Sequence, residues 1–230
     1  MAFTFESCGL EIEADGVHLN IPIKPSIRKP EEMKDVAYDP SSLDQIKEPL
    51  YYMYRDIWSL CPECDRLCKR HMLRYDITII RPGLMGKEYY KTVGHFHPIN
   101  KDKNVTYPEL YEIISGKALF LAQEMHGKGF QVIIANKGEH ALIPYNHGHV
   151  TVNVGNEPLI MGNLVASTFD SEYGPVKEKK GLAYYILTDG MLENPNYKEH
   201  PPATQRVATP GPPIGMLFKR DPKHYERLLL

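Results

Sequence analysis

Thr92-Val93-Gly94-His95-Phe96-His97 is the most informative segment of this 230-residue chain. On a β-strand, two histidines separated by one residue project from the same face. Two imidazoles side by side offer two nitrogen ligands to a transition-metal ion. Taken alone, the pair is equally compatible with ordinary surface histidines, so the rest of the chain has to distinguish the two interpretations.

Short segments rich in Tyr, Ile and Val lie on both sides of this segment, and turn sequences such as Arg81-Pro82-Gly83 and Gly155-Asn156 separate them. Many short strands at this spacing predict a mainly β fold, an antiparallel sandwich or barrel. The expected strands are Leu50–Ile57, Leu73–Ile80, Glu88–His97, Glu109–Ile114, Lys117–Gln123, Phe130–Ala135, His149–Val154, Pro158–Val165 and Leu182–Leu187.

Two later segments add further polar side chains to predicted strands. Glu109 and Tyr111 share one strand face, as do His149, Thr151 and Asn153. The residues between the last three are valines, so that strand alternates polar and apolar side chains with a period of two. A carboxylate and a third imidazole are therefore available beside the histidine pair.

The spacing of these groups resembles the two motifs of the cupin superfamily. In that family the first motif supplies two histidines and a glutamate, and the second supplies a third histidine. The resemblance implies a cupin-type antiparallel β-barrel, or jelly roll, with His95, His97, Glu109 and His149 as ligands of one divalent metal ion per subunit. Fe(II) is the first choice, and Zn, Mn and Ni suit the same ligands. The interval between His97 and Glu109 is longer than usual, and Asn146 stands where the motif has glycine.

A finer resemblance is to the archaeal-type cupin glucose-6-phosphate isomerases. It implies reversible isomerisation of glucose 6-phosphate and fructose 6-phosphate through a metal-stabilised enediol, in glycolysis and gluconeogenesis, by a cytoplasmic homodimer. The stretches that carry it are Pro82–Glu88, Thr92–His97, Glu109–Tyr111, His149–Pro158 and Glu172-Tyr173-Gly174.

The same resemblance implies roles for individual residues. Thr78, Thr92 and Gly94 match the family positions that hold the substrate phosphate, and hydroxyls with a close backbone amide suit a phosphate. Glu109 is the expected catalytic base. Tyr111, on the same strand face, is expected to pass a proton between substrate oxygens or to orient Glu109.

Two family positions are substituted in this chain. The family's late tyrosine and histidine fall at Val165 and Ser171, so part of the expected pocket lacks its usual groups. Lys87, Lys91 and Tyr145 are the candidates that we consider as replacements.

Two other functions fit the same ligand set. An Fe(II) cupin dioxygenase uses such ligands to activate oxygen. A non-catalytic sugar-binding cupin shares the fold, because fold alone does not establish activity. The complete ligand set favours an enzyme over a binding protein.

The four cysteines, Cys8, Cys61, Cys64 and Cys68, are too few to suggest a disulfide framework in a chain of this size, and a reducing compartment such as the cytoplasm is expected. Cys61, Cys64, Cys68 and His71 are spaced as one helix face, with Pro62 in the first turn. A structural or dimer-bridging metal site is the alternative.

Composition and proline content predict the remaining organisation. Residues 1–50 are expected to form an arm on the core with a helix at Ser41–Lys47, residues 51–190 the barrel, and residues 191–230 a proline-rich tail without a regular helix or central strand. The tail packs along the domain or crosses to a partner subunit. A net charge of −2 argues against nucleic acid as a partner, and no apolar run is long enough for a membrane span.

Overall fold

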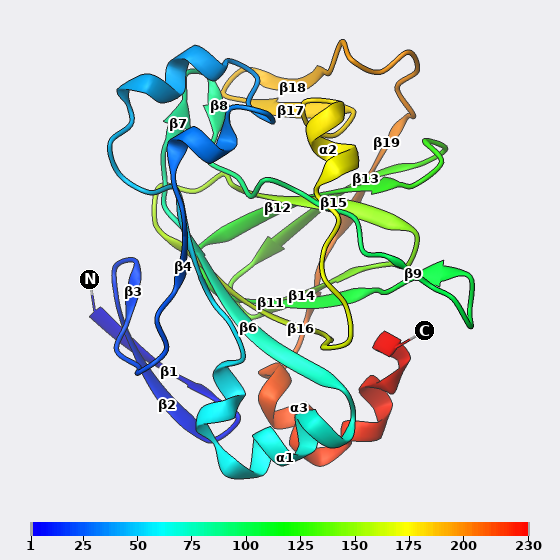
Figure 1. Ribbon diagram of the computed structural model, residues 1–230. Helices are drawn as coiled ribbons and strands as arrows, with labels where there is room; N and C mark the ends of the chain where they lie inside the picture. Colours follow the sequence, from blue (N-terminus) through cyan, green and yellow to red (C-terminus); the bar gives the residue numbers. More distant parts are fainter. Residues whose placement is uncertain (1, 230) are drawn as a thin grey trace.

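The computed structural model describes residues 2–229, and two main sheets face each other at its centre (Figure 1). The first contains β4 (Ser26–Arg28), β5 (Tyr51–Tyr54), β6 (Leu73–Ile80), β11 (Glu109–Ser115), β14 (Glu139–Ile143), β16 (Leu159–Ala166) and β20 (Thr209–Pro210). The second contains β12 (Lys117–Glu124), β13 (Phe130–Asn136), β15 (His147–Asn153) and β19 (Ala203–Val207).

The strand order is β20-β14-β11-β16-β6-β5-β4 in the first sheet and β15-β12-β13-β19 in the second. Neighbours pair antiparallel except β13 and β19, which are parallel. The predicted mainly β fold of antiparallel strands is therefore confirmed. Among the described residues the strands form facing sheets, as in a jelly roll, and do not form a single closed ring.

Smaller elements surround the two sheets. One small sheet contains β1 (Ala2–Ser7), β2 (Leu10–Asp15) and β3 (His18–Leu19), and a second contains β7 (Leu84–Met85), β8 (Glu88–Tyr89), β17 (Tyr184–Leu187) and β18 (Gly190–Glu193). A third pairs β9 (Ile99–Asn100) with β10 (Val105–Thr106). The helices are η1 (Pro30–Met33), η2 (Pro40–Gln45), η3 (Ile57–Leu60), α1 (Pro62–Arg70), α2 (Gly174–Glu178), α3 (Ile214–Arg220) and η4 (Pro222–Leu229).

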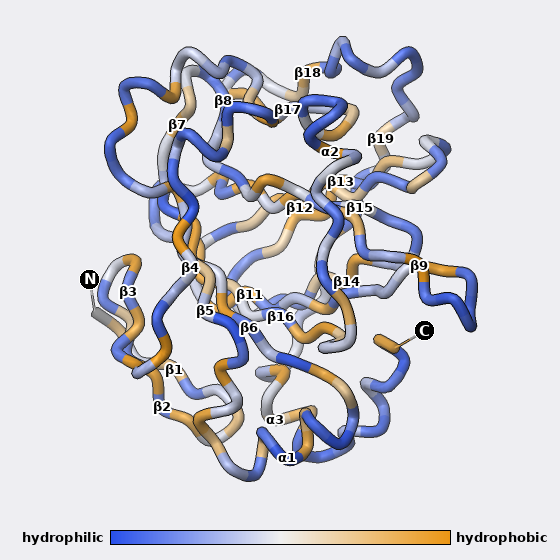
Figure 2. Tube along the Cα trace, in the orientation of Figure 1, coloured by the Kyte–Doolittle hydropathy of each residue, from blue (hydrophilic) through white to orange (hydrophobic). Residues whose placement is uncertain are grey.

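Apolar side chains form two cores, one on each face of the seven-stranded sheet. The first lies between the two main sheets and includes Phe120 and Val152. The second lies beneath the outer face of the larger sheet, where β1–β3, α1, α3 and η4 cover it, and includes Trp58 and Phe218. Figure 2 shows hydrophobic segments along the inner strands and hydrophilic ones in outer loops, such as the loop from β9 to β10. Each fully buried large apolar side chain stabilises the fold by about 1.5–3 kcal/mol.

The side chains of β6 alternate between the second core and the space between the two main sheets. Tyr75, Ile77 and Ile79 are fully buried in the second core, whereas the residues between them are polar and face the space between the sheets. The predicted strand Leu73–Ile80 has the bounds observed. Its polar face forms part of the functional cavity described below.

Gly162 on β16 leaves room for the side chain of Tyr75, which lies against it on the outer face of the larger sheet. A Cβ atom at Gly162 would lie 1.8 Å from the Tyr75 hydroxyl. That hydroxyl donates to Glu112 Oε1 at 2.5 Å, and the ring stacks on Trp58 with centroids 4.2 Å apart. Glu112 Oε2 accepts a hydrogen bond from the backbone N–H of Ile214 at 2.8 Å. This buried chain of contacts fixes the start of α3 to the central sheet.

Several sequence-based predictions differ from the structure in detail. Of the predicted strand Glu88–His97, only β8 is regular, and the remainder makes isolated bridges. The predicted helix at Ser41–Lys47 is the 3₁₀-helix η2, which Asp39 caps through the backbone N–H of Ser41. The helix predicted around Cys64 is confirmed as α1, with Pro62 in its first turn.

The proline-rich tail contradicts the prediction that it cannot hold a helix. It contains α3 and contributes β19 and β20 to sheet edges. Pro213 is the N-cap of α3 and Pro222 begins η4. At such positions proline has no intrahelical hydrogen bond to lose, so it marks helix starts and does not break a helix.

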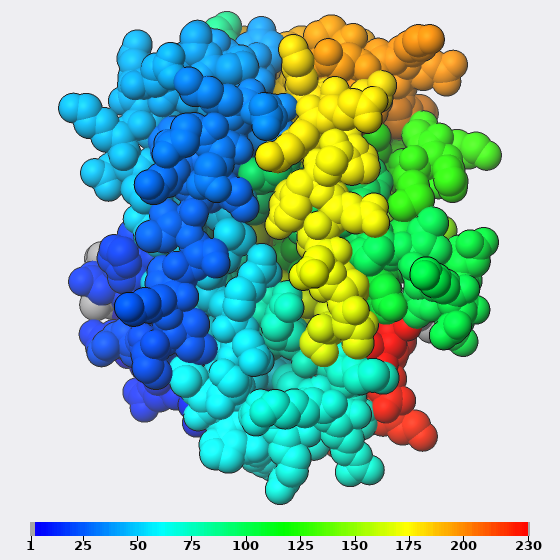
Figure 3. Space-filling view, in the orientation of Figure 1, coloured from blue at the N-terminus to red at the C-terminus, as the bar shows by residue number. Residues whose placement is uncertain are grey.

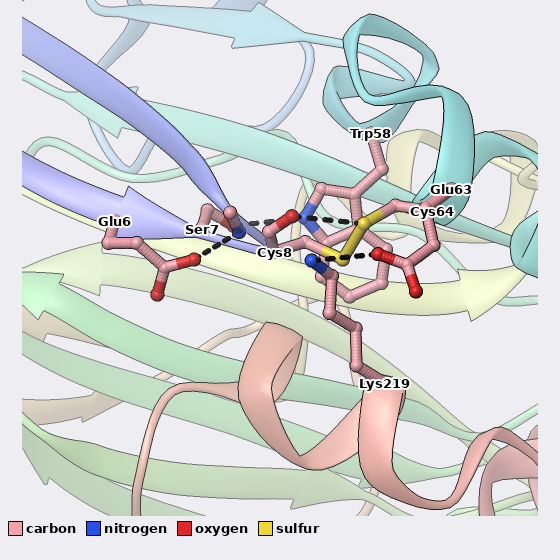
Figure 4. The surroundings of a disulfide bond; sticks show 8 residues. Glu6, Ser7, Cys8, Trp58, Glu63, Cys64 and Lys219 are labelled. Atoms are coloured by element: carbon pink, nitrogen blue, oxygen red, sulfur yellow. Dashed lines mark hydrogen bonds and ion pairs between the residues drawn. A yellow bond between two sulfur atoms is a disulfide. The ribbon is translucent and has the colours of Figure 1, made fainter.

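A disulfide joins Cys8 to Cys64, contrary to the expectation that the cysteines form no disulfide framework (Figure 4). It joins the turn after β1 to α1, and Lys219 of α3 lies beside it, 3.2 Å from Glu63. Cys61 and Cys68 are free thiols. The clustering of three cysteines hid this pairing, because the partner of Cys64 lies 56 residues away in the sequence.

We expect thiol titration of denatured, unreduced protein to detect two free thiols, and four after reduction, because only Cys61 and Cys68 are unpaired. Closing a loop of this length stabilises a fold by up to about 4 kcal/mol. Cys64→Ser should therefore lower the free energy of unfolding measured with denaturant, whereas Cys61→Ser should leave it nearly unchanged. Four thiols before reduction would contradict the bond.

Candidate metal centre

A cavity of about 360 Å³ opens between the two main sheets. Strands of the larger sheet form one wall, and β15 with the segment Thr92–His97 forms the other. The chain that follows β16, yellow in Figure 3, lies across this face of the molecule. Phe169, Ser171 and Tyr173 of that chain line the cavity, so it forms part of the rim.

His95, His97, Glu109 and His149 meet in this cavity. One ligand atom from each lies within 4.8 Å of the others. His95 and His149 also pair through their backbones, with N–H to carbonyl distances of 3.2 and 2.9 Å. Glu109 begins β11 on the opposite sheet. Backbone pairing therefore joins the two sequence motifs that the resemblance implied.

The nitrogen and carboxylate oxygen atoms of this cluster point at one another. His97 Nδ1 lies 2.7 Å from the Tyr107 carbonyl, and donating to that carbonyl leaves Nε2 bare in the neutral ring. Nε2 lies 3.1 Å from His95 Nε2 and 3.3 Å from Glu109 Oε2. The buried Oε2 has no hydrogen-bond partner. Lone pairs facing each other in this way require a cation, so the residues fit a divalent metal ion.

The protonation states suit metal binding. Burial, followed by the nearby rings of His149 and His97, lowers the pKa of His95 well below its usual value, so its imidazole is neutral. Burial acts to raise the pKa of Glu109, but contact with His149 and His97 outweighs it and holds that pKa well below the usual value. A carboxylate and neutral imidazoles are the forms that bind metals.

Two further side chains contact the candidate ligands. Asn163 Nδ2 donates to Glu109 Oε1 at 2.6 Å, which leaves Oε2 directed at the histidines. The Tyr111 hydroxyl lies 2.8 Å from His149 Nε2. Burial, and then the charge of Glu109, raise the pKa of Tyr111 well above its usual value, so the phenol keeps its proton.

The three residues predicted to hold phosphate all line the cavity. Thr92 Oγ1 accepts a hydrogen bond from the Thr151 N–H at 3.0 Å, so its own hydroxyl hydrogen is free to donate. Gly94 has a φ of +82°, and a Cβ there would lie 2.3 Å from Val150 Cγ2. Within residues 2–229 no acceptor takes its N–H.

The two substituted family positions, Val165 and Ser171, also line the cavity. The three candidate replacements, Lys87, Lys91 and Tyr145, do not line it. Lys91 Nζ is held by Glu88 at 2.5 Å and by the Val36 carbonyl at 2.8 Å. Lys87 pairs with Asp189 near the surface, and Tyr145 is half exposed.

Sequence reasoning missed four residues that line or support the cavity: Arg55, Arg74, Asp76 and Asn163. Arg74 and Asp76 alternate with the apolar residues of β6, and this polar face was the signal that could have revealed them.

None of the helices within residues 2–229 has both the length and the apolar character that a membrane span needs.

Comparisons with a family model and with named proteins give consistent matches. A model of the family "Glucose-6-phosphate isomerase (GPI)" matches residues 27–202. The glucose-6-phosphate isomerase of Thermococcus kodakarensis is 30% identical over 83% of this chain and 96% of its own length. The glucose-6-phosphate isomerase of Pyrococcus abyssi is 28% identical over 76% of this chain and 89% of its own length.

Among solved structures, the oxalate decarboxylase of Lactobacillus farciminis aligns with a TM-score of 0.40 and 19% identity, over 55% of this chain and 31% of its own. A recombinant oxalate oxidase aligns with a TM-score of 0.42 and 14% identity, over 56% of this chain and 58% of its own. The family model covers both histidine motifs, Glu109 and the cavity walls around them. The chain belongs to the glucose-6-phosphate isomerase family of aldose–ketose isomerases.

Proposed function

We propose that this cavity interconverts glucose 6-phosphate and fructose 6-phosphate at a divalent metal ion held by His95, His97, Glu109 and His149. The observation that carries this proposal is the convergence of four candidate ligand atoms within 4.8 Å, inside a cavity that Thr78, Thr92 and Gly94 also line. The shared family supports the substrate.

An ion held by these four residues would supply Lewis acidity, which stabilises negative charge that develops on the substrate oxygens. We propose Fe(II) as the native ion, because three imidazoles and one carboxylate with open positions suit it. The same ligands accept Zn(II), Mn(II) or Ni(II).

Thr78, Thr92 and Gly94 bind the substrate phosphate in this proposal. Two hydroxyls and one backbone N–H supply donors without a fixed positive charge. Thr78 lies on β6 and the other two lie on the facing segment, so the phosphate bridges the two walls of the cavity.

Glu109 is the proposed base. Because Glu109 is also a proposed ligand, it would be loosely bound or would exchange when substrate binds. Its Oε2 would then take the proton from carbon 2 of glucose 6-phosphate while the oxygen on carbon 1 gains a proton, which gives the enediol. The same proton would return to carbon 1 as the oxygen on carbon 2 loses its own, which gives fructose 6-phosphate. Asn163 holds the other carboxylate oxygen, which keeps Oε2 aimed into the cavity. The Tyr111 hydroxyl lies 2.8 Å from His149 Nε2, and in this proposal it passes a proton between the substrate oxygens.

Metal dependence is the first test of this proposal. Conversion of fructose 6-phosphate, followed by a coupled dehydrogenase, should vanish after chelation and return with Fe(II), Zn(II), Mn(II) or Ni(II) added one at a time. No activity with any ion in folded, metal-containing protein would overturn the proposal and favour a sugar-binding cupin. Oxygen uptake on adding substrate would favour the dioxygenase instead.

Replacing the base should separate metal binding from turnover. Glu109→Gln should retain much of the metal, measured by elemental analysis, while kcat falls by a factor of about 10²–10⁴, the usual contribution of a general base. Tyr111→Phe keeps the carboxylate and should lose less. Full activity in Glu109→Gln would remove Glu109 from this role.

We further propose that the protein acts as a cytoplasmic homodimer in glycolysis and gluconeogenesis. Apolar side chains exposed on β18 and β19, namely Met191, Leu192 and Val207, support association. The pathway follows from the substrates of the named relatives. The Cys8–Cys64 bond is at odds with a reducing compartment, where such bonds are rare.

Light scattering on the eluted protein should give twice the mass of one chain over a range of concentrations. Exposed apolar edges and a symmetric two-fold contact are the usual basis of such dimers. A mass of one chain at all concentrations would rule out the homodimer.

A further inference from the structure

The first turn of helix α1 carries a second group of reactive side chains, on the face of the larger sheet away from the cavity. Cys61 is the N-cap of α1, Pro62 occupies its first position, and Cys64 stands at its third. Cys64 is bonded to Cys8, whereas Cys61 is a free thiol. Side chains three positions apart lie on one side of a helix. A thiol and one sulfur of a disulfide therefore share a single helical turn.

The two free thiols of the chain differ in how readily they react. Cys68 is buried, and burial raises the pKa of its thiol to about 12, so it keeps its proton at neutral pH. Cys61 is partly exposed and makes no capping hydrogen bond. The thiolate is the form that attacks a disulfide, and the unpaired N–H groups at the start of a helix stabilise negative charge. Cys61 is therefore the thiol that is placed to attack.

The acidic groups around this turn are already paired. Glu63 and Asp65 are the acidic residues of the first turn. Lys219 of α3 lies 3.2 Å from Glu63, and Lys69 lies 2.7 Å from Asp65. Figure 4 shows the first of these pairs beside the disulfide. Two carboxylates that would repel a thiolate are thus offset by neighbouring ammonium groups.

The disulfide itself is shielded from reagents in solution. Cys8 and Cys64 are both 0% exposed. Gly215 of α3 lies so close that a Cβ atom there would be 2.5 Å from the Cys8 backbone nitrogen. A dissolved thiol therefore has no path to either sulfur in the folded chain, whereas Cys61 is on the same turn as Cys64.

Cys8 also belongs to a unit that keeps its own pairing without the disulfide. With Gly9 it forms the two-residue turn between β1 and β2, with φ values of +55° and +82°. Left-handed residues are what a two-residue hairpin turn requires. The six residues of β1 all pair with β2. Breaking the disulfide therefore separates this hairpin from α1 without dismantling it.

We propose that Cys61-Pro62-Glu63-Cys64 is a thiol–disulfide exchange site, which moves the disulfide from Cys8–Cys64 to Cys61–Cys64 and frees the N-terminal hairpin from α1. The Cys61 thiol gives its proton to water, and the thiolate attacks Cys64 Sγ. As the new S–S bond forms, the old bond breaks with its electron pair on Cys8 Sγ, which then takes up a proton. One disulfide and two thiols remain, so the step needs no oxidant or reductant.

A chain of buried contacts joins the disulfide to the cavity wall. Trp58 Nε1 donates to the hydroxyl of Ser7, the residue before Cys8, at 2.9 Å. The Trp58 indole stacks on Tyr75 of β6, with ring centroids 4.2 Å apart. Because β6 forms part of the cavity wall, the exchange gives the protein a thiol-dependent control that is separate from the metal ligands. Trp58 is the single tryptophan of the chain, so its fluorescence reports on this contact.

Disulfide mapping is the test, because the number of free thiols does not change. Folded protein is held at about pH 8, close to the pKa of an ordinary thiol. It is then quenched and unfolded in acid, where exchange stops, alkylated there and digested without reduction. We expect a Cys61–Cys64 peptide and alkylated Cys8 to appear at a rate independent of protein concentration. Cys61→Ser should abolish both, whereas Cys68→Ser, the matched control, should change neither.

Cys8→Ser reproduces the released state directly, and thermal unfolding shows whether it folds. Oxidised glutathione should close one Cys61–Cys64 bond in this variant, with two molecules of reduced glutathione released, while Cys68 stays a free thiol. The emission maximum of Trp58 should move to longer wavelength, because the hairpin that covers the indole is no longer tied to α1. An unchanged maximum would mean that the hairpin stays docked, which overturns its release.

The remaining outcomes each contradict the exchange site. Absence of the Cys61–Cys64 bond from either protein would overturn it, as would a rate that rises with protein concentration, which indicates exchange between chains. A bond between Cys64 and Cys68 would remove Cys61 from the role of attacking thiol. None of these results depends on whether the cavity isomerises a sugar phosphate.

Discussion

Backbone pairing between His95 and His149 is the interaction on which the site depends. Two segments far apart in the sequence exchange N–H and carbonyl contacts there, and each brings an imidazole to the same point. The third histidine follows two positions after the first, and Glu109 approaches from the opposite sheet. Because backbone geometry sets these positions, the donor atoms are held together before any ion binds.

The two faces of β6 explain how the cavity stays rigid and polar. One face is buried in an apolar core that α1, α3 and the N-terminal sheet cover, whereas the other carries charges held by the buried Asp76. A buried carboxylate is costly unless it is fully paired, and here two guanidinium groups and a backbone N–H pair it. Cationic donors near the metal ligands are therefore fixed by the fold.

The fold class and the four residues of the candidate metal centre could be predicted from the sequence, because period-two alternation and motif spacing are local signals. Strand β6 and helix α1 were predicted for that reason. The Cys8–Cys64 bond and the Arg55–Asp76 pair join residues distant in the sequence, so no local pattern revealed them. The prediction for the tail was wrong because its prolines stand where helices begin. Proline content alone does not show whether a proline begins a helix or interrupts one.

Packing on the far side of the sheet restricts which amino acid can stand at position 162. Any side chain there would occupy the space of the Tyr75 hydroxyl, which holds Glu112 and through it the start of α3. Tyr75 lies between Arg74 and Asp76, so its displacement would shift the strand that carries them. Natural selection for the chemistry of the cavity would therefore restrict the amino acid allowed at a position that touches no substrate.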